Sequence, residues 1–295
     1  MEETRSIIIN EQNFPDANFR SYLMEQDYAK DGVIADVNDV TEIDVYRKNI
    51  SDLKGIELFC ALQKLQCSGN QLTSLDVSQN TALTELSCYS NKLPVLDVSK
   101  NLALKELNCY SNQLPELDVT QNTELTELRC YSNQLKELDI TQNVALTFLW
   151  CCYNQLTTLD ISKNTQLKEL WCNGNQLSSL DVSQNTALTF LWCCFNQLTE
   201  LDVSKNTALS ELRCYNNQLT TLDVSKNVAL TELRCNDNQL TSLNVSENAA
   251  LQELWCYDNK LTSLDVISNT ALTELRCYNN QLTSLDVTKN TAVIE

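Results

Sequence analysis

A 21-residue period, with a cysteine in every copy, runs from Leu62 towards the end of the chain. Each copy reads L-x-x-L-x-C-x-x-N-x-L-x-x-L-(D/N)-(V/I)-x-x-N-x-x. A copy this short cannot bury its own apolar face, so successive copies must stack on one another. The eleven copies open at Leu62, Leu83, Leu104, Leu125, Leu146, Leu167, Leu188, Leu209, Leu230, Leu251 and Leu272.

Leucines and asparagines at this spacing are typical of a leucine-rich repeat solenoid, a right-handed superhelix with the curvature of a horseshoe. We expect one parallel β-sheet on the concave face, a loop-rich convex face, and a small helical cap at the N-terminus. The predicted boundaries are a cap at 1–39, an atypical first repeat of the 22-residue type at 40–61, eleven 21-residue repeats at 62–292, and the start of a further repeat at 293–295.

Composition excludes several classes of function. The net charge is -18, whereas phosphate backbones require clustered Lys and Arg, so we expect no nucleic-acid partner. No apolar run reaches the ~18 residues of a transmembrane helix, so we expect no membrane insertion. The chain has no histidine and no catalytic motif set apart from the repeats, so we expect neither enzymatic activity nor a cofactor. No signal peptide is visible after Met1, which fits either a cytosolic protein or a chain whose signal lies outside it.

Eleven of the fourteen cysteines occupy one position of the repeat and alternate with core leucines, so we expect them to face the core. Neighbouring parallel strands are ~4.8 Å apart, whereas the Cβ atoms of a disulfide converge to ~3.8 Å. We therefore expect free thiols that pack as small hydrophobes. A metal–thiolate stack is the alternative, although a straight column supplies no converging ligands. The column is Cys67, Cys88, Cys109, Cys130, Cys151, Cys172, Cys193, Cys214, Cys235, Cys256 and Cys277.

The outward-facing strand positions form columns that are rich in Glu, Arg and Tyr, but aromatic residues replace Glu and Arg in the two copies 146–166 and 188–208. All four tryptophans lie in one of these columns. Soluble proteins rarely expose contiguous apolar patches without a use, and Trp and Tyr dominate binding hot spots. We therefore predict a ligand-binding patch on the concave face, made of Phe148, Trp150, Tyr153, Trp171, Phe190, Trp192, Phe195, Arg213, Arg234 and Trp255.

Stacking alone is the alternative explanation for these aromatic residues. Cross-strand aromatic pairs contribute ~0.2–1 kcal/mol each to a sheet, which accounts for the tyrosine column but less well for the aromatic residues shared by the same two copies. Cys152 and Cys194 lie in the outward-facing tyrosine column. We expect them to be outward-facing thiols, ~9.6 Å apart and too distant to bridge, with no chemistry of their own.

Two asparagine columns and one aspartate column run beside the leucines, from Asn70 to Asn280, from Asn80 to Asn290, and from Asp76 to Asp286, with Asn244 in one aspartate position. An inward-facing asparagine can bond the backbone of adjacent turns, which buried loops require. The aspartates could hold cations or accept hydrogen bonds from backbone and Ser/Thr groups, as Asx motifs do, and we expect the second.

The N-terminal segment predicts a helix that starts near Asn13-Phe14-Pro15-Asp16, with Phe19, Tyr22 and Leu23 as its apolar stripe. The following segment, 27–38, resembles an EF-hand loop through Asp27, Asp31 and Gly32. Ala29 and Asn38, however, stand where carboxylates are usual. We expect a structural turn that shields the first repeat, and Asp27 with Asp31 remains a weak candidate calcium loop.

The motif with its cysteine, followed by N-x-L-x-x-L-D-V-S-x-N, resembles the bacterial internalins over residues 62–293. The segment from Ile43 to Ile56 resembles a first internalin-type repeat. The resemblance implies a secreted or surface-anchored bacterial protein, with its signal peptide and anchor outside this chain, that binds molecules of a host or neighbouring cell. Wall-anchoring modules are absent from this chain, which stops where a further copy would begin. Terminal repeats normally need a polar cap, so we expect either a fragment of a longer protein or self-association through the uncapped C-terminal end.

These observations favour a non-catalytic binding or adhesion module that recognises a protein or carbohydrate through its concave aromatic face. An intracellular or injected scaffold or effector domain that mediates protein–protein interaction is the alternative, because a column of free thiols suits a reducing compartment. The sequence does not distinguish a protein ligand from a glycan, since aromatic faces serve both.

Overall fold

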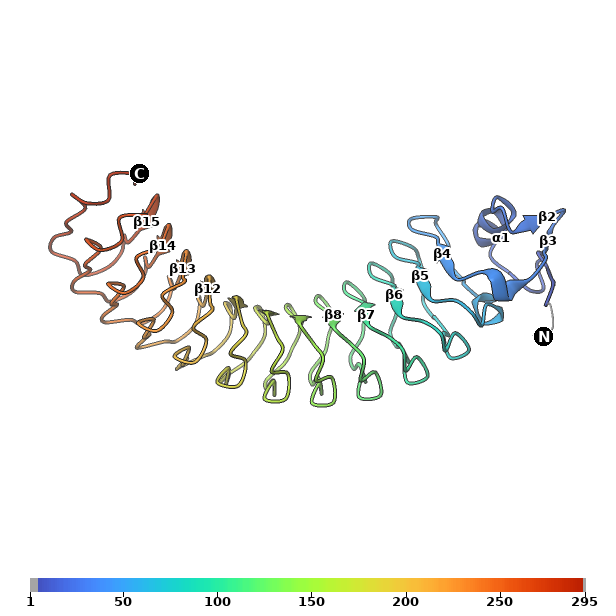
Figure 1. Ribbon diagram of the computed structural model, residues 1–295, viewed down its shortest axis with the longest axis horizontal. Helices are drawn as coiled ribbons and strands as arrows, with labels where there is room; N and C mark the ends of the chain where they lie inside the picture. The colour runs from blue at the N-terminus through green and yellow to red at the C-terminus, as the bar shows by residue number, and fades with distance from the viewer. Residues whose placement is uncertain (1–4, 294–295) are drawn as a thin grey trace. The chain divides into compact units, whose positions relative to one another are not determined.

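A computed structural model describes residues 5–293, in two compact units of which the first ends at Ala145 and the second begins at Leu146. Within each unit the strands line the concave side and the loops lie on the convex side (Figure 1). The first unit contains β1 (Ile7–Ile8), α1 (Ala17–Met24), β2 (Ala29–Lys30), β3 (Val33–Ile34), the 3-10 helix η1 (Val37–Asp39), β4 (Glu42–Asp44), the 3-10 helix η2 (Ile56–Leu58), β5 (Lys64–Gln66), β6 (Glu85–Ser87), β7 (Glu106–Asn108) and β8 (Glu127–Arg129).

The second unit continues the repeats with one short strand in every 21 residues. Its strands are β9 (Phe148–Trp150), β10 (Glu169–Trp171), β11 (Phe190–Trp192), β12 (Glu211–Arg213), β13 (Glu232–Arg234), β14 (Glu253–Trp255) and β15 (Glu274–Arg276). From β4 to β8 and from β9 to β15, successive strands pair in parallel and in register, so each residue of a strand lies beside its counterpart from the next repeat. The predicted leucine-rich repeat solenoid is thus confirmed.

The central leucine of each strand faces the core, because side chains alternate along a strand. Leu149, Leu170 and Leu191 are fully buried, whereas the residues on either side of each remain half-buried. The cysteine column continues this core: its members from Cys67 to Cys256 are fully buried, and Cys277 is half-buried. The prediction that these thiols act as small core hydrophobes is confirmed.

Both asparagine columns satisfy backbone carbonyls of neighbouring turns. In the first column, Asn175 Nδ2 donates to Cys151 O at 3.1 Å and to Cys172 O at 3.0 Å, while its Oδ1 accepts from Leu156 N at 3.0 Å. In the second, Asn206 Nδ2 donates to Val182 O and Asn185 O, both at 2.9 Å. Each asparagine therefore links its own turn to preceding ones, as the sequence predicts.

The aspartate column forms Asx turns on the outside of the repeats. Asp160 Oδ1 accepts from Ser162 N at 2.9 Å, and Asp202 Oδ1 accepts from Ser204 N at 2.9 Å. Hydrogen bonds from the serine side chain and then from its backbone hold the pKa of Asp160 and Asp202 below the usual value. Asn244 makes the same turn with Ser246, so the turn does not require the charge.

The cap segment that resembles an EF-hand loop in sequence forms a structural turn. Asp27 to Ile34 is a β-hairpin in which β2 and β3 pair antiparallel across Asp31-Gly32. Both turn residues have positive φ, 51° and 77°, as a type I′ turn requires, and Asp-Gly is a preferred sequence for that turn. β1 adds to the other edge of β3. Among the described residues no three Cys, Asp or Glu side chains gather into a metal site.

The helix of the cap begins where the sequence predicts, at Ala17. Its N-cap is Asp16, whose Oδ1 accepts from Asn18 N and Phe19 N. Asp16 Oδ2 also accepts from the backbone and hydroxyl of Ser51 in the first repeat, at 2.8 and 2.9 Å. These two hydrogen bonds join the cap to the first repeat. Within the described part of the chain, no helix is long and apolar enough to cross a membrane.

The thiols provide a direct test of the core. Burial raises the pKa of Cys88 to about 12, and only a thiolate reacts readily. Cys60 lies outside the column and is exposed. We expect an aromatic disulfide reagent to label Cys60 quickly in the native protein and the buried cysteines far more slowly. All fourteen thiols of the sequence should react in denaturant without reductant, and a lower count would contradict a free-thiol ladder.

Candidate binding face

The three central tryptophans of the predicted patch form a face-to-face stack. Ring centroids are 4.1 Å apart between Trp150 and Trp171 and 4.0 Å apart between Trp171 and Trp192, with interplanar angles of 5° and 6°. The strand register places these rings directly beside one another. The rings are half-buried, because each face of the central ring contacts another ring. Stacking therefore occupies the ring faces and leaves the edges for a ligand.

At its Trp192 end, the tryptophan stack contacts the guanidinium group of an arginine. The Arg213 guanidinium lies 4.0 Å from the centroid of Trp192, and Trp192 Nε1 donates to Glu211 Oε1 at 2.6 Å. A guanidinium over an indole face is attracted by the ring quadrupole. Trp171 differs, since its buried Nε1–H has no hydrogen-bond partner among residues 5–293.

Beyond the tryptophan stack, alternating Glu and Arg side chains form an ion-pair ladder. Arg213 Nε contacts the carboxylates of Glu211 and Glu232 at 2.6 and 2.8 Å, and Arg234 Nε contacts those of Glu232 and Glu253 at 2.8 and 2.7 Å. These side chains are about one-fifth exposed, so the ion pairs are less screened than surface pairs. From the sequence, these glutamates were expected only as part of a charged rim around the patch. The signal for the ion pairs was present, because Glu and Arg occupy two neighbouring outward-facing columns of the same repeats.

Trp255 lies apart from the three-ring stack. Its ring is enclosed by Arg234 at 3.8 Å and Arg276 at 4.1 Å. The structure thus brings Arg213 onto the stack and links Arg234 to it through Glu232. Trp255 belongs to the far end of the ladder, and both of its ring faces are covered by guanidinium groups.

The most exposed members of the patch are Tyr153 and Phe195, with 56% and 45% of their surface accessible. Both sit at the turn that ends the strand, with φ of 52°. At the equivalent position other repeats carry residues that tolerate or suit this backbone, such as Gly174, Asn216 and Asp237. A bulky side chain with positive φ costs about 1–3 kcal/mol. These two rings occupy an unfavourable backbone and bury little surface in return.

The Tyr153 ring packs against Gly174. A Cβ at Gly174 would lie 2.6 Å from Cδ1 and 2.9 Å from Cε1 of Tyr153, so the ring rests on the glycine backbone of the next repeat. Phe195 instead meets Tyr215 edge to face, with centroids 5.2 Å apart. Both rings therefore lean towards the following repeat, and each has a defined support.

Cys152 and Cys194 contradict the prediction of outward-facing thiols. They are only 5% and 2% exposed. A small side chain in a column of tyrosines is covered by larger neighbours, and the Cys194 thiol interacts with the Tyr215 hydroxyl. Burial raises the pKa of Cys152 to about 12 and also raises that of Cys194. Both thiols are part of the support beneath the patch.

Tyrosines form a second stack on the strand face of the first unit. Tyr89, Tyr110 and Tyr131 lie with ring centroids 4.2 Å apart and nearly parallel planes. Burial, and then the neighbouring phenol Tyr110, raise the pKa of Tyr89 to about 12. Stacking is thus a general property of aromatic columns here. It explains the tyrosines and the tryptophans, but not the exposed rings of Tyr153 and Phe195.

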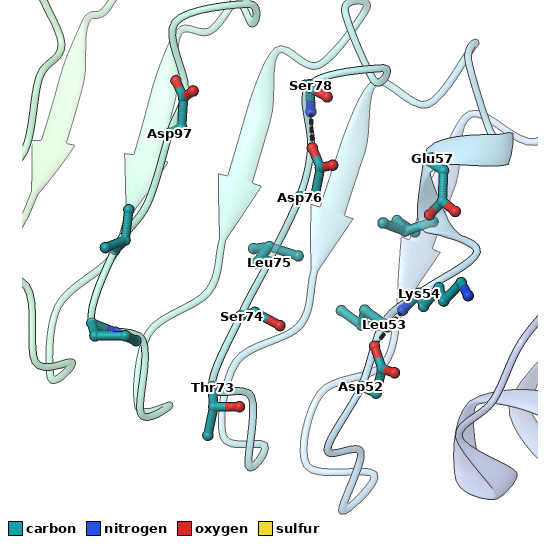
Figure 2. Close-up of a pocket in the computed structure, with 13 residues that line it drawn as sticks. Asp52, Leu53, Lys54, Glu57, Thr73, Ser74, Leu75, Asp76, Ser78 and Asp97 are labelled. Carbon is teal, nitrogen blue, oxygen red and sulfur yellow. Dashed lines mark hydrogen bonds between the residues drawn. The ribbon is translucent and has the colours of Figure 1, made fainter.

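The sequence did not indicate a hollow of about 890 Å³ on the first unit, away from the strand residues. Figure 2 shows its lining, which includes Asp52, Asp76 and Asp97. These carboxylates cap turns: Lys54 N donates to Asp52 Oδ1 at 2.8 Å, and Ser78 N donates to Asp76 Oδ1 at 2.9 Å. Similar hollows recur at 95–139 and 179–223. They follow from the repeat itself and do not single out a site.

The last described strand, β15, pairs with β14. Beside it Leu275, Arg276, Cys277 and Tyr278 line an open hollow of about 570 Å³. Self-association at this end remains a prediction. Of the further repeat expected at 293–295, residues 294–295 lie outside the described residues.

Comparison with known proteins shows which families share this architecture. A family model for "Leucine Rich repeats (2 copies)" matches residues 144–185 and 249–290. Internalin J of Listeria monocytogenes serotype 4b (strain F2365) is 41% identical over 71 residues, which are 23% of this chain and only 8% of that protein.

Solved structures extend the similarity over the whole repeat region. The functional domain of InlJ from Listeria monocytogenes, which includes a cysteine ladder, superposes with a TM-score of 0.85 at 36% identity, over 99% of this chain and 71% of that chain. The internalin InlF from Listeria monocytogenes gives a TM-score of 0.85 at 26% identity, over 96% of this chain and 87% of that chain. The ladders of cysteine and asparagine, together with these similarities, show that the chain belongs to the internalin family of leucine-rich repeat proteins.

Proposed function

We propose that this chain is the non-catalytic binding module of a bacterial secreted or cell-surface protein, and that it recognises a protein or glycan through the strand face between Phe148 and Phe195. The leucine-rich repeat fold of the internalins suits a protein-binding module. One observation carries the choice of site: two exposed aromatic rings, Tyr153 and Phe195, occupy a backbone that disfavours them. Strain without compensating burial is characteristic of functional surfaces.

The surroundings of these rings support the same site. Phe148 and Phe190 replace glutamates of the first outward column in the same two repeats, and both are half-buried. The ion-pair ladder from Glu211 to Glu253, which contains Arg213 and Arg234 of the patch, borders its aromatic residues from Phe148 to Phe195 on the C-terminal side. An apolar centre with a polar, partly solvated border is the usual anatomy of a protein interface.

The tryptophans give this proposal a direct readout, because all four of the sequence lie on the strand face. We expect a saturable change in tryptophan emission when extracellular glycoproteins or polysaccharides that bind the patch are titrated. A Trp171→Ala/Trp192→Ala variant removes the stack that supports the patch. It should weaken binding by at least ~30-fold, the effect of losing one hot spot of about 2 kcal/mol.

Tyr278→Ser is a matched control, since Tyr278 is an exposed aromatic residue of the same face but lies outside the patch. Its affinity should equal that of the wild type. Calorimetry should accompany the emission measurement, because the double variant loses two of the reporting rings. Binding that survives in the double variant but is lost in Tyr278→Ser would place the site elsewhere on the face.

The fourteen free thiols favour a second candidate. A protein rich in unpaired cysteine suits a reducing compartment, and an injected or intracellular recognition domain would use the same face. Antibody labelling of intact and permeabilised cells of the source bacterium separates the two proposals. Labelling of intact cells supports the surface module, and labelling only after permeabilisation supports the intracellular domain.

A further inference from the structure

One glutamate of the strand face lies among aromatic residues at the centre of the patch. Strands β9, β10 and β11 read FLW, ELW and FLW, so Glu169 is the single charged residue of the three. The register places Phe148 beside it on one side and Phe190 on the other. All three residues are half-buried. The first outward column of the patch therefore has one carboxylate flanked by two phenylalanines.

The other glutamates of this column in the second unit all contact an arginine. Their distances to the nearest arginine Nε are 2.6–2.8 Å, and they are Glu211, Glu232, Glu253 and Glu274. Among residues 5–293, no Lys or Arg lies within ion-pair distance of Glu169. The reason is in the sequence, since the column that supplies these arginines has tryptophan in the three repeats around Glu169.

The protein's own arginines show which group combines with glutamate and aromatic rings on this face. Arg276 Nε contacts Glu274 at 2.6 Å, and its guanidinium lies 4.1 Å from the Trp255 ring centroid. Arg234 Nε contacts Glu253 at 2.7 Å and lies 3.8 Å from the same ring. A guanidinium is planar, so it can bond a carboxylate through its edge and stack on a ring through its face. An ammonium group has no such face.

The spacing of the repeats allows one flat group between rings two repeats apart. Trp171 fills that space between Trp150 and Trp192, with centroid distances of 4.1 and 4.0 Å. The distances from guanidinium to ring on this face, 3.8–4.1 Å, are nearly the same. Phe148 and Phe190 lie on the same two strands as Trp150 and Trp192. A guanidinium at Glu169 would therefore lie one ring spacing from each phenylalanine.

Resting on the function proposed above, we propose that the strand face binds an arginine side chain of a partner protein, with its guanidinium on Glu169 between Phe148 and Phe190. The partner thus supplies the arginine that the ion-pair ladder lacks in these repeats. The net charge of -18 attracts a basic partner over a longer range. Arginine is preferred to lysine because its guanidinium is more weakly hydrated and stacks on aromatic rings.

The test uses two blocked nonapeptides in which four arginines, or four lysines, alternate with five glycines. Both peptides carry the same charge, so their non-specific attraction to the acidic chain is nearly equal. Calorimetry measures their binding to the full chain at physiological ionic strength. We expect the arginine peptide to bind at least ~5-fold more tightly than the lysine peptide. Equal affinities, or no binding of the arginine peptide, would overturn the inference.

A pair of glutamate variants locates the contact. Glu169→Gln should weaken binding of the arginine peptide at least ~5-fold and abolish the preference for arginine over lysine. Glu106→Gln is the matched control, because Glu106 occupies the same column but lies between Glu85 and Glu127 instead of between rings. It removes the same charge and should leave the preference unchanged. If both variants weaken the arginine peptide equally, only the overall charge attracts it and the inference is wrong.

Phe148→Leu/Phe190→Leu tests the rings separately from the carboxylate. Leucine keeps the half-buried positions apolar but has no ring quadrupole for a cation. The preference for the arginine peptide should fall below ~2-fold, while the circular dichroism spectrum and the urea unfolding midpoint show that the variant is folded. A preference as large as that of the wild type in the folded variant would contradict the proposed site.

A second set of titrations separates failure of this inference from failure of the proposed function. The glycoproteins and polysaccharides described above are titrated against Trp171→Ala/Trp192→Ala and Glu169→Gln. If the arginine preference is absent but one of these ligands is lost in the tryptophan variant, the patch is a binding site and only the arginine inference falls. If the preference is absent and every ligand binds the tryptophan variant as it binds the wild type, the proposed site falls as well.

Discussion

Replacing Asn206 by leucine is expected to lower the free energy of unfolding by about 1–3 kcal/mol. Asn206 is fully buried, and its Nδ2 donates to Val182 O and Asn185 O at 2.9 Å each. Leucine is similar in size but has no donor, so Val182 O and Asn185 O each lose one of two hydrogen bonds and keep only the backbone donor, Asn185 N or Leu188 N. Each lost hydrogen bond contributes about 0.5–1.5 kcal/mol net. Added apolar burial offsets only part of this loss.

The position of Asn206 also makes its loss felt by the whole second unit. Both carbonyls belong to earlier turns, so the side chain contributes to the interface between neighbouring repeats. In a solenoid, stability is approximately the sum of terms for single repeats and for interfaces between neighbours. We therefore expect urea unfolding of Asn206→Leu to show a lower midpoint and a broader transition, as the array begins to unfold in separate segments.

Two further variants decide whether hydrogen bonding is the cause. Asn206→Asp keeps the shape but replaces the donor by a buried carboxylate, and it should destabilise at least as much at neutral pH. Thr207→Ala changes an exposed neighbour in the same turn and should alter the free energy of unfolding by less than about 0.5 kcal/mol. A leucine variant as stable as the wild type would show that apolar packing alone maintains this column.

The parts of the fold that depend on period were predictable from sequence. Burial of Leu170, Cys172 and Asn185 follows from register, because a shift of one residue would expose the entire apolar set. The aspartate turns were equally accessible, since Asp160 and Ser162 have the spacing of an Asx turn. These properties are local or repetitive, and neither depends on a contact that only a folded chain defines.

The cap and the details of the face were less accessible. The segment around Asp31-Gly32 resembles a calcium loop in sequence, and only the pairing of β2 with β3 shows that these two residues form the turn of a hairpin. Cys152 was misassigned because its exposure depends on the size of its neighbours and not on alternation. The ring orientations in the tryptophan stack depend on side-chain rotamers that a sequence does not fix.

The two strained rings do have a signal in the sequence. Tyr153 and Phe195 share a column with Gly174, Asn216 and Asp237, which are residue types that favour positive φ. Aromatic residues in such a column indicate backbone strain from residue types alone. This signal is visible only when the same position is compared between repeats, and not within a single repeat. It identifies Tyr153 and Phe195 as the members of the patch that most strongly indicate a function.

Gly55→Ala is expected to lower the free energy of unfolding of the cap by about 3 kcal/mol or more, since backbone strain and lost core packing act together. Gly55 has φ of 102°, which L-residues rarely adopt. Its missing side chain would also lie 2.3 Å from Phe14 Cδ1 and 2.5 Å from Asn13 O. Phe14 is fully buried beside Phe19 and Phe59, with ring centroids 5.6 and 6.1 Å away, so it cannot withdraw without disturbing both.

Hydrogen exchange is the appropriate measurement, because no tryptophan precedes Trp150 and tryptophan emission cannot report on the cap. Amides of α1 and of the first repeat should exchange faster in Gly55→Ala, while those of β9–β15 should remain protected. Such a difference is expected where an array loses its terminal cap and opens from that end.

Gly32→Ala separates backbone strain from steric conflict. Gly32 also has positive φ, 77°, but a Cβ there would meet no atom of the described residues within 4 Å, so only the backbone cost of about 1 kcal/mol should be seen. Phe14→Ala tests the conflict itself: the loss in the double variant Gly55→Ala/Phe14→Ala should be clearly smaller than the sum of the two single losses, because removing the ring also removes the clash. If Gly55→Ala is no worse than Gly32→Ala, or if the two losses simply add, the close approach of Phe14 to Gly55 does not hold the cap on the repeats.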